Sequence, residues 1–344
     1  MKTLLCMALA LILAVITLEC IIRNVRFKWS STRLGADGTS NSVTTVVWRL
    51  EGNGVSHWNA DGVRSRTNSS YHGKSILAIG DSFTESYQVN DDEVFTAVLE
   101  NQLKARGVGL PVLNLGASGA ALPQYIAKAN HHKARFSPEW TVIQLRDEDL
   151  TKEAWAVERF PRFETNSDGK GIHLVLQKQG KEPHSKLYQA YPQLYQHVAF
   201  PIYLIERFML FRMMFKKEAP LFKAGYLHSS SAMEEPGLSA YPLAQEIELV
   251  RDAYEGRLTI LYLAPYDPRA PMIASPMEIE LHKSCKQHGI NFVTTRSLHD
   301  RFKSRSISPF GFPNSNFNVG HCNREGHQAI ADLLVEEIHK MVTK

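Results

Sequence analysis

The sequence is poor in cysteine, and this scarcity removes several classes of protein. Only four of its 344 residues are cysteine, and two of these lie within the first 20 residues. The other two, Cys285 and Cys322, belong to no CxxC motif and no cysteine–histidine cluster, so no structural zinc site is expected. They either form one disulfide or remain as two buried thiols, and we favour the thiols. We predict neither a metal nor a cofactor.

Nucleotide- and nucleic-acid-binding features are also missing. The chain has no phosphate loop, no dinucleotide fingerprint, no internal repeat and no low-complexity segment. Its 39 basic and 35 acidic residues leave a formal net charge of +4, which is too small an excess to predict binding to nucleic acid. The 44% hydrophobic and 22% charged content instead predicts an ordinary globular protein.

One long hydrophobic run lies at the N-terminus. Residues 3–22 contain a single charge, Glu19, and a helix of this length rises about 1.5 Å per residue, enough to cross a bilayer core of roughly 30 Å. A cleaved signal peptide is the alternative, but the run ends without a small-x-small cleavage site. The sequence therefore predicts one uncleaved transmembrane anchor. The basic residues that follow it would, by the positive-inside rule, place the remainder in the cytoplasm.

Strand and helix patterns alternate after a polar linker and cap region at 23–72, which contains one candidate strand at 44–50. Short apolar runs predict five further strands, at 75–79, 112–115, 140–145, 258–264 and 290–294. Amphipathic patterns predict helices that begin at Asp91, Leu122, Pro242, Pro276 and Arg324. This alternation predicts an α/β protein, a three-layer α/β/α sandwich over 73–344 with a mainly parallel five-stranded, flavodoxin-like sheet.

A segment at about 151–240 interrupts the alternation, and we interpret it as a mostly helical insertion. It contains a candidate hairpin at 172–177 and an apolar, basic stretch at 200–217. That stretch is either an amphipathic helix on a membrane surface or, as we favour, a helix packed on its own domain.

Three short motifs lie where the carboxyl ends of the predicted strands should be. Gly80-Asp81-Ser82-Phe83-Thr84 follows the first buried strand, VLNLGASG ends at Gly119, and Gly320-His321-Cys322-Asn323 precedes the last helix. These motifs resemble conserved blocks of the SGNH (GDSL-like) hydrolase superfamily, in its membrane-anchored bacterial form.

The resemblance implies a serine esterase with Ser82 as nucleophile and His321 as general base. The backbone N–H groups of Ser82 and Gly119 would stabilise the oxyanion, with Asp81 and Asn323 in supporting roles. It further implies a carboxylic ester substrate, such as an acetylated cell-envelope or exported polysaccharide. It also implies a periplasmic domain on a bacterial inner membrane, opposite to the orientation expected from the charges.

Two positions depart from the family pattern. Glu148 stands where the third oxyanion donor, an asparagine, is usual, and Asn318 stands where the acid of the triad is usual. Either Arg146 compensates for the first change or the acids at 147–149 point away from the oxyanion. The second leaves either a Ser–His dyad or a charge supplied by Asp147, Glu148 or Asp149. An acyltransferase that transfers to glycan and a degenerate glycan-binding protein therefore remain alternatives.

Overall fold

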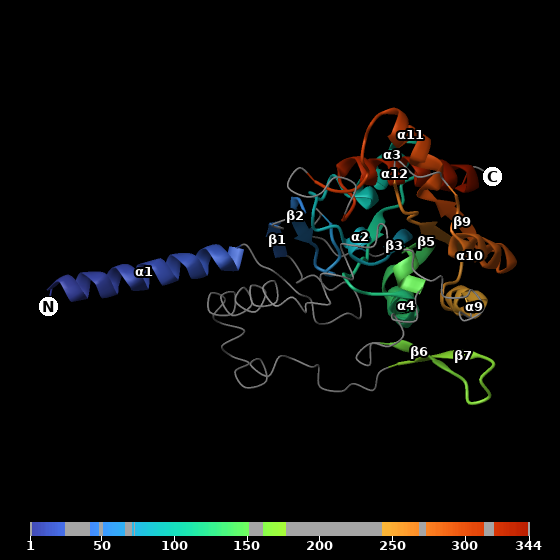
Figure 1. The fold of residues 1–344 in the computed structure, drawn as a ribbon, viewed down its shortest axis with the longest axis horizontal. Helices are drawn as coiled ribbons and strands as arrows, with labels where there is room; N and C mark the ends of the chain where they lie inside the picture. The colour runs from blue at the N-terminus through green and yellow to red at the C-terminus, as the bar shows by residue number, and fades with distance from the viewer. Residues whose placement is uncertain are drawn as a thin grey trace.

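The centre of the protein is a five-stranded parallel sheet (Figure 1). The computed structural model describes residues 2–24, 42–47, 51–65, 71, 73–150, 161–176, 243–267, 273–312 and 320–342. The strands of this sheet are β3 (Ser75–Ile79), β4 (Val112–Asn114), β5 (Pro138–Leu145), β8 (Arg257–Tyr262) and β9 (Asn291–Thr294). The predicted α/β fold with a mainly parallel five-stranded sheet is confirmed.

The strand order of the sheet is β4-β3-β5-β8-β9, and each neighbouring pair is parallel. The chain first proceeds from β3 to β4 on one side and then crosses to β5 on the other side of β3. In open parallel sheets, ligands bind at such a switch point, beyond the carboxyl ends of the strands. Ser82 follows directly after β3 at this point.

Helices cover both faces of the sheet. They are α2 (Ser82–Glu85), α3 (Phe95–Ala105), α4 (Leu122–Phe136), α9 (Leu243–Ala253), α10 (Pro276–Gln287), α11 (His299–Ser304) and α12 (Arg324–Val342), with the 3₁₀ helices η1 (Asp147–Leu150) and η4 (Thr295–Leu298). Helices α4, α9 and α10 contribute to the core on one face, whereas α3 and α12 contribute to the core on the other.

The β3 strand shows how the sequence produces these two cores. All five of its residues are buried; Leu77 and Ile79 lie in one core, and Ile76 and Ala78 lie in the other. Successive strand residues point to opposite faces, so a continuous apolar run is required where both faces are covered. Full burial of each such large aliphatic side chain stabilises the fold by about 1.5–3 kcal/mol.

The two cysteines of the domain lie in different cores. Cys285 belongs to the α4-side core and Cys322 to the α12-side core, and both are free thiols. The sheet separates them, so the disulfide alternative is wrong and the prediction of two buried thiols is confirmed.

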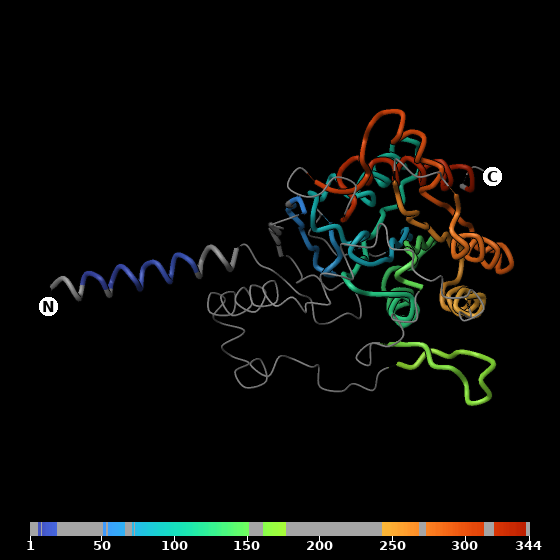
Figure 2. The backbone as a smooth tube through the Cα atoms, viewed as in Figure 1, coloured from blue at the N-terminus to red at the C-terminus, as the bar shows by residue number. Residues whose placement is uncertain are grey.

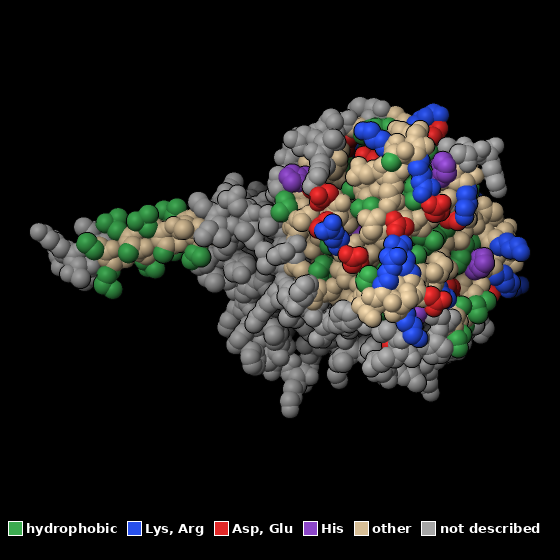
Figure 3. Space-filling model, turned by 90° about the horizontal axis from the view of Figure 1, so that it is seen from above, with side chains coloured by type: hydrophobic (Ala, Val, Ile, Leu, Met, Phe, Trp, Pro, Cys, Tyr) green, Lys and Arg blue, Asp and Glu red, His purple; other side chains and the backbone are tan. Residues whose placement is uncertain are grey.

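Helix α1 (Lys2–Asn24) lies apart from these cores (Figure 2). Its described large apolar side chains, between Met7 and Leu18, are exposed, as the apolar surface of the helix in Figure 3 shows. Within the described residues, however, no helix combines the length and the apolarity needed to cross a membrane. The structure thus does not support the transmembrane anchor predicted for residues 3–22.

Two antiparallel hairpins accompany the sheet. The strands β1 (Ser42–Val47) and β2 (Asn53–Trp58) pair within the predicted linker and cap region, and β6 (Arg162–Thr165) pairs with β7 (Ile172–Val175) near the hairpin predicted at 172–177. The rest of the predicted insertion, including the stretch at 200–217, lies outside the described residues.

The start of α3 differs from the prediction. The helix begins at Phe95 and not at Asp91, because the Asp91 carboxylate accepts hydrogen bonds from Arg64 Nε at 2.8 Å and from the backbone N–H of His57 at 3.1 Å. Asp91 is therefore part of a loop anchor and not of the first helical turn.

Candidate active site

Ser82 is the first residue of the short helix α2, immediately beyond the carboxyl end of β3. Asp81 caps this helix, with its Oδ1 accepting a hydrogen bond from the Phe83 N–H at 2.9 Å. Gly80 fits because a Cβ there would lie 2.3 Å from Thr84 Oγ1 and 2.6 Å from Gln144 Oε1. The motif therefore turns the chain sharply and leaves the serine at the edge of the sheet. Burial raises the pKa of the Asp81 carboxyl.

His321 lies between the serine and a carboxylate. Its Nε2 is 2.7 Å from Ser82 Oγ, and its Nδ1 is 2.6 Å from Glu51 Oε2. The Glu51 side chain is only 4% exposed, and the Phe83 ring stacks on the imidazole with centroids 4.7 Å apart. With Nδ1–H donating to Glu51, Nε2 is left to accept the proton of the serine hydroxyl. The three side chains thus have the connectivity of a nucleophile–base–acid triad.

Glu51 was missed by the sequence analysis. It precedes β2, 270 residues before His321, and carries no local motif. The sequence offered only weak signals, a lone acid at the end of an apolar run and a glycine, Gly52, directly after it. In the structure this glycine has a φ of +59°. Asn318, predicted at the position of the acid, lies outside the described residues.

Gly320 makes the approach of Glu51 to His321 feasible. Its φ is +95°, in the left-handed region, and a Cβ built there would lie 2.0 Å from Glu51 Oε1. The same carboxylate also accepts the backbone N–H of His321 at 3.3 Å. A side chain at 320 and the carboxylate of Glu51 cannot occupy the same space, so this glycine is needed for packing as well as for conformation.

Two unengaged backbone N–H groups point to an oxyanion site. In the described part of the chain, the amides of Ser82 and Gly119 donate to no partner, although most of the amides around them are bonded. Gly119 has a φ of +72°, which a glycine adopts without strain. Both were predicted oxyanion donors, and they flank the loops that follow β3 and β4.

Glu85 links these two loops. Its Oε2 accepts the Ser118 backbone N–H at 2.8 Å and also the Ser118 hydroxyl. Gly116 lies so close to α2 that a Cβ there would be 2.2 Å from the backbone nitrogen of Glu85. The buried Glu85 thereby fixes the residue directly before Gly119. Burial raises the pKa of its carboxyl, although the bonds from Ser118 oppose this.

Arg64 holds the loop that follows the nucleophile. Its guanidinium is buried and donates from Nη1 to the carbonyls of Glu85 and Ser86, each at 2.6 Å, and from Nη2 to that of Val89 at 2.8 Å. Ser86 has a φ of +57°, an unfavourable conformation for serine. These bonds over-determine the loop and keep the strained residue in place.

The acids after β5 do not contact His321 in the described structure. Asp147 accepts the Tyr262 hydroxyl at 2.6 Å, and buried Asp149 accepts the backbone N–H of Arg146 at 2.8 Å. Burial raises the pKa of both carboxyls. Glu148, predicted near the oxyanion, has a 69% exposed side chain and accepts a bond from Arg146 Nη2 at 2.9 Å. Its carboxylate accepts this hydrogen bond and does not replace the amide donor of an asparagine.

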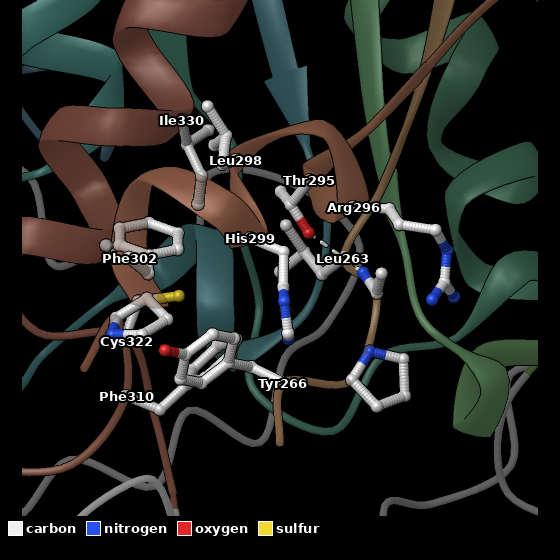
Figure 4. Close-up of a pocket in the computed structure, with 14 residues that line it drawn as sticks. Leu263, Tyr266, Thr295, Arg296, Leu298, His299, Phe302, Phe310, Cys322 and Ile330 are labelled. Carbon is white, nitrogen blue, oxygen red and sulfur yellow. Dashed lines mark hydrogen bonds between the residues drawn. The ribbon is translucent and has the colours of Figure 1, made fainter. Parts of the chain in front are cut away.

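An apolar pocket lies next to this arrangement, beyond Cys322 (Figure 4). Phe310, His299, Tyr266 and Leu263 are among its lining residues, and the sulfur of Cys322 points into it. Burial raises the pKa of the Cys322 thiol to about 12, so this sulfur is not a thiolate at neutral pH and does not compete as a nucleophile.

The supporting asparagine caps the last helix. Asn323 Oδ1 accepts the Gly326 N–H at 3.1 Å at the start of α12, and its Nδ2 donates to the carbonyls of Ser308 and Gly311. These bonds fix the chain on the C-terminal side of His321. Among the described residues, no group of three or more histidine, cysteine, aspartate or glutamate side chains could hold a metal ion.

Comparisons with known proteins give structural similarities alone. No family model matches the chain, and no curated protein matches its sequence. Solved structures of similar arrangement include an α/β hydrolase from the metagenome of Lake Arreo, a lipolytic G-D-S-L protein from Veillonella parvula, and a catalytic mutant of an acetylxylan esterase from Geobacillus stearothermophilus. Their respective identities are 14%, 11% and 14%, and their TM-scores are 0.36, 0.37 and 0.39. The matches cover 78%, 77% and 79% of this chain and 95%, 97% and 96% of the others. Identities this low say nothing of a shared activity, so function has to be inferred from the site.

Proposed function

We propose that the protein is a serine esterase in which Ser82, His321 and Glu51 form the catalytic triad. The observation that carries the proposal is the continuous pair of contacts through His321, at 2.7 Å to the hydroxyl and 2.6 Å to the carboxylate. A serine hydroxyl is a weak nucleophile unless a base accepts its proton, and the base works best when a third group orients it. Glu51 supplies the charge that the replacement at Asn318 removes.

In the proposed reaction, Ser82 Oγ attacks the acyl carbon of an ester and His321 Nε2 takes the hydroxyl proton. The imidazolium is stabilised by the buried carboxylate of Glu51 at Nδ1. The oxyanion of the tetrahedral intermediate accepts the N–H groups of Ser82 and Gly119. The proton then passes from His321 to the leaving alkoxide. Water, activated by His321 in the same way, releases the acyl group from the serine.

A binding protein without activity is the less supported alternative. It rested on the missing acid of the triad and on the missing third oxyanion donor, and the buried glutamate at His321 Nδ1 speaks against the first of these two arguments. The acetylated polysaccharide substrate and the periplasmic location stay predictions from the family resemblance. A transferase would share the same acyl-enzyme and differ in the acceptor that releases it.

The test is labelling of the full-length chain with a fluorophosphonate, followed by peptide mass spectrometry. We expect one adduct, on Ser82, which Ser82→Ala and His321→Ala both abolish. Ser304→Ala removes an exposed serine outside the site and serves as the matched control. A folded protein that stays unlabelled, or that is labelled equally in the His321→Ala variant, would contradict an activated serine.

A further inference from the structure

The guanidinium of Arg146 lies beside the candidate triad, and some of its N–H donors have no hydrogen-bond acceptor among the described residues. Its Cζ lies 4.0 Å from the centroid of the Phe83 ring, and this ring also stacks on His321. Phe83 is the residue next to Ser82. The guanidinium therefore lies over an aromatic ring at the edge of the site, in a cation–π contact that leaves its N–H groups available to hydrogen-bond acceptors.

Most of the donors of this side chain have no acceptor. Nη2 donates to Glu148 Oε1 at 2.9 Å, whereas Nε and Nη1 donate to nothing in the described residues. The Arg146 side chain is 29% exposed, so water and a ligand can both reach it. Arginine offers a rigid planar fork that matches the two oxygens of a carboxylate. A single guanidinium also matches the single charge of that group.

The existing partner of Arg146 is a weak competitor. The Glu148 side chain is 69% exposed, and exposed ion pairs contribute little because water screens them. Two other acids lie near this charge: the buried Asp149 accepts the backbone N–H of Arg146, and Asp81 accepts that of Phe83. An incoming carboxylate can thus displace Glu148 without leaving a buried charge unpaired.

The side chain of Arg146 is also separable from the fold. Its backbone bonds into the turn at η1, through its N–H to Asp149 and its carbonyl, which accepts the Asp149 N–H at 3.1 Å. Its side chain hydrogen-bonds to that turn only through the exposed carboxylate of Glu148. A substitution that shortens the side chain therefore leaves the backbone bonds in place. This distinguishes Arg146 from Arg64, whose buried guanidinium bonds directly to three backbone carbonyls.

From these contacts we infer that Arg146 binds a carboxylate on the substrate, so that the site prefers esters carrying a negative charge close to the reacting acyl group. This inference rests on the proposed esterase function and assigns the substrate class: acyl esters of carboxylate-bearing alcohols. The competing Glu148 sets how strong that preference is.

The test compares two esters of equal shape on the full-length protein. These are 4-acetoxybenzoate and the neutral 4-acetoxybenzamide, each corrected for its rate of spontaneous hydrolysis. We expect kcat/KM to favour the anionic ester, and Arg146→Gln to reduce that preference by about 10- to 100-fold, the range for a hydrogen-bonded charge, mainly through KM. Arg146→Lys should retain part of the preference, and Glu148→Gln should increase it.

Arg106→Gln is the matched control, because Arg106 likewise pairs with an exposed glutamate, Glu336, outside the site. It should leave the preference unchanged. Equal losses on both esters in Arg146→Gln would overturn the inference and assign the residue to the reacting centre or to the fold. Measurable hydrolysis of both esters by the wild type with equal kcat/KM would overturn it as well.

A binding measurement separates this inference from the proposed activity. In the Ser82→Ala background, calorimetric titration with the two esters reports binding without turnover. Tighter binding of the anionic ester that Arg146→Gln abolishes supports the inference, even if the wild type hydrolyses neither ester. Active hydrolysis with no difference in binding refutes it and leaves the esterase proposal intact.

Discussion

His321 is held at its two nitrogens by two different regions of the molecule. Nε2 faces Ser82 at the switch point of the parallel sheet, and Nδ1 faces Glu51 beside the N-terminal β1–β2 hairpin. The first contact is built from loops that follow core strands, which is where α/β sheets usually carry their chemistry. The second comes from outside the sheet. The proposed nucleophile and base therefore belong to the core, whereas the proposed acid comes from a region added to it.

The largest loss of activity should come from removing the negative charge of Glu51. Glu51→Gln keeps the size of the side chain but replaces the acceptor of Nδ1–H with an amide, which allows the wrong imidazole tautomer and no longer stabilises the imidazolium. We expect ester hydrolysis to fall by about 10⁴-fold in kcat, as for an amide substitution at the acid of a serine triad.

Two controls accompany this measurement. Glu255→Gln removes an 84% exposed carboxylate outside the site and should leave kcat unchanged. Asn318→Ala should have a much smaller effect than Glu51→Gln. A larger loss in kcat for Asn318→Ala than for Glu51→Gln would assign the role of the acid to residue 318 and contradict the proposed contribution of the hairpin region.

A smaller loss of activity should follow from a substitution that pushes Glu51 away from His321. Gly320→Ala introduces a Cβ that would lie 2.0 Å from Glu51 Oε1, so the carboxylate has to move away from His321. Misplacement of a catalytic group by about 1 Å typically lowers rates about 100-fold. The measurement is kcat for ester hydrolysis, together with circular dichroism to verify folding.

Gly107→Ala separates the clash from the backbone strain. Gly107 has a φ of +81° and nothing within 4 Å of a built Cβ, so it carries the same conformational penalty in open space. Equal losses of activity in the two alanine variants would mean that strain, and not the contact with Glu51, explains the result.

Within the core region, Glu85 should have a more modest effect. Glu85→Gln weakens the two bonds that Ser118 donates and loosens the loop carrying the Gly119 N–H. We expect kcat to fall about 10-fold with little change in KM, because an oxyanion donor acts mainly in the transition state. Ser118→Ala, which keeps the backbone N–H, should cause a smaller loss. A rise in KM at constant kcat would assign Glu85 to substrate binding.

The smallest effect concerns stability. Burial, aided by the neighbouring Asp81 carboxylate and opposed by the Arg146 charge, raises the pKa of Asp149 well above its usual value. The folded protein therefore binds the proton more tightly than the unfolded chain. Its free energy of unfolding should decrease as the pH rises from about 4, the usual carboxyl pKa, through the raised pKa, by at most about 1.4 kcal/mol per pH unit for this group.

Asp149→Asn removes this titration and keeps an oxygen that can accept the Arg146 N–H. Urea denaturation of both proteins between pH 4 and 7 should give a shallower decline for the variant. An identical pH dependence in the two proteins would show that Asp149 does not titrate in this range.

The contrast between the regions also explains what the sequence could predict. The parallel sheet follows from apolar runs such as Ser75–Ile79, since burial on both faces leaves a local pattern. Ser82, Gly119 and His321 could be identified because each sits in a short motif beside a strand or helix. Glu51 could not, because its partner lies 270 residues away and a single acid at the end of an apolar run belongs to no recognisable motif.

The predicted start of α3 was also wrong, because a tertiary contact outweighed the local sequence pattern. The acids at 91–93 suit the first turn of a helix, yet Arg64 and His57 bind Asp91 and delay α3 to Phe95. Helix propensity depends on neighbouring residues alone, so it cannot predict a partner that is distant in the sequence.

The position of Glu51 has a consequence for how proteins of this kind are classified. A comparison restricted to the α/β core would align Ser82 and His321, find no acid before the histidine, and sort the chain among inactive homologues. The proposed acid, Glu51, lies between β1 and β2, N-terminal to the parallel sheet, in a part of the chain that such a comparison would leave out. Searching the segments outside the core for a carboxylate able to reach the imidazole would separate inactive proteins from those in which the acid of the triad comes from a different position in the sequence.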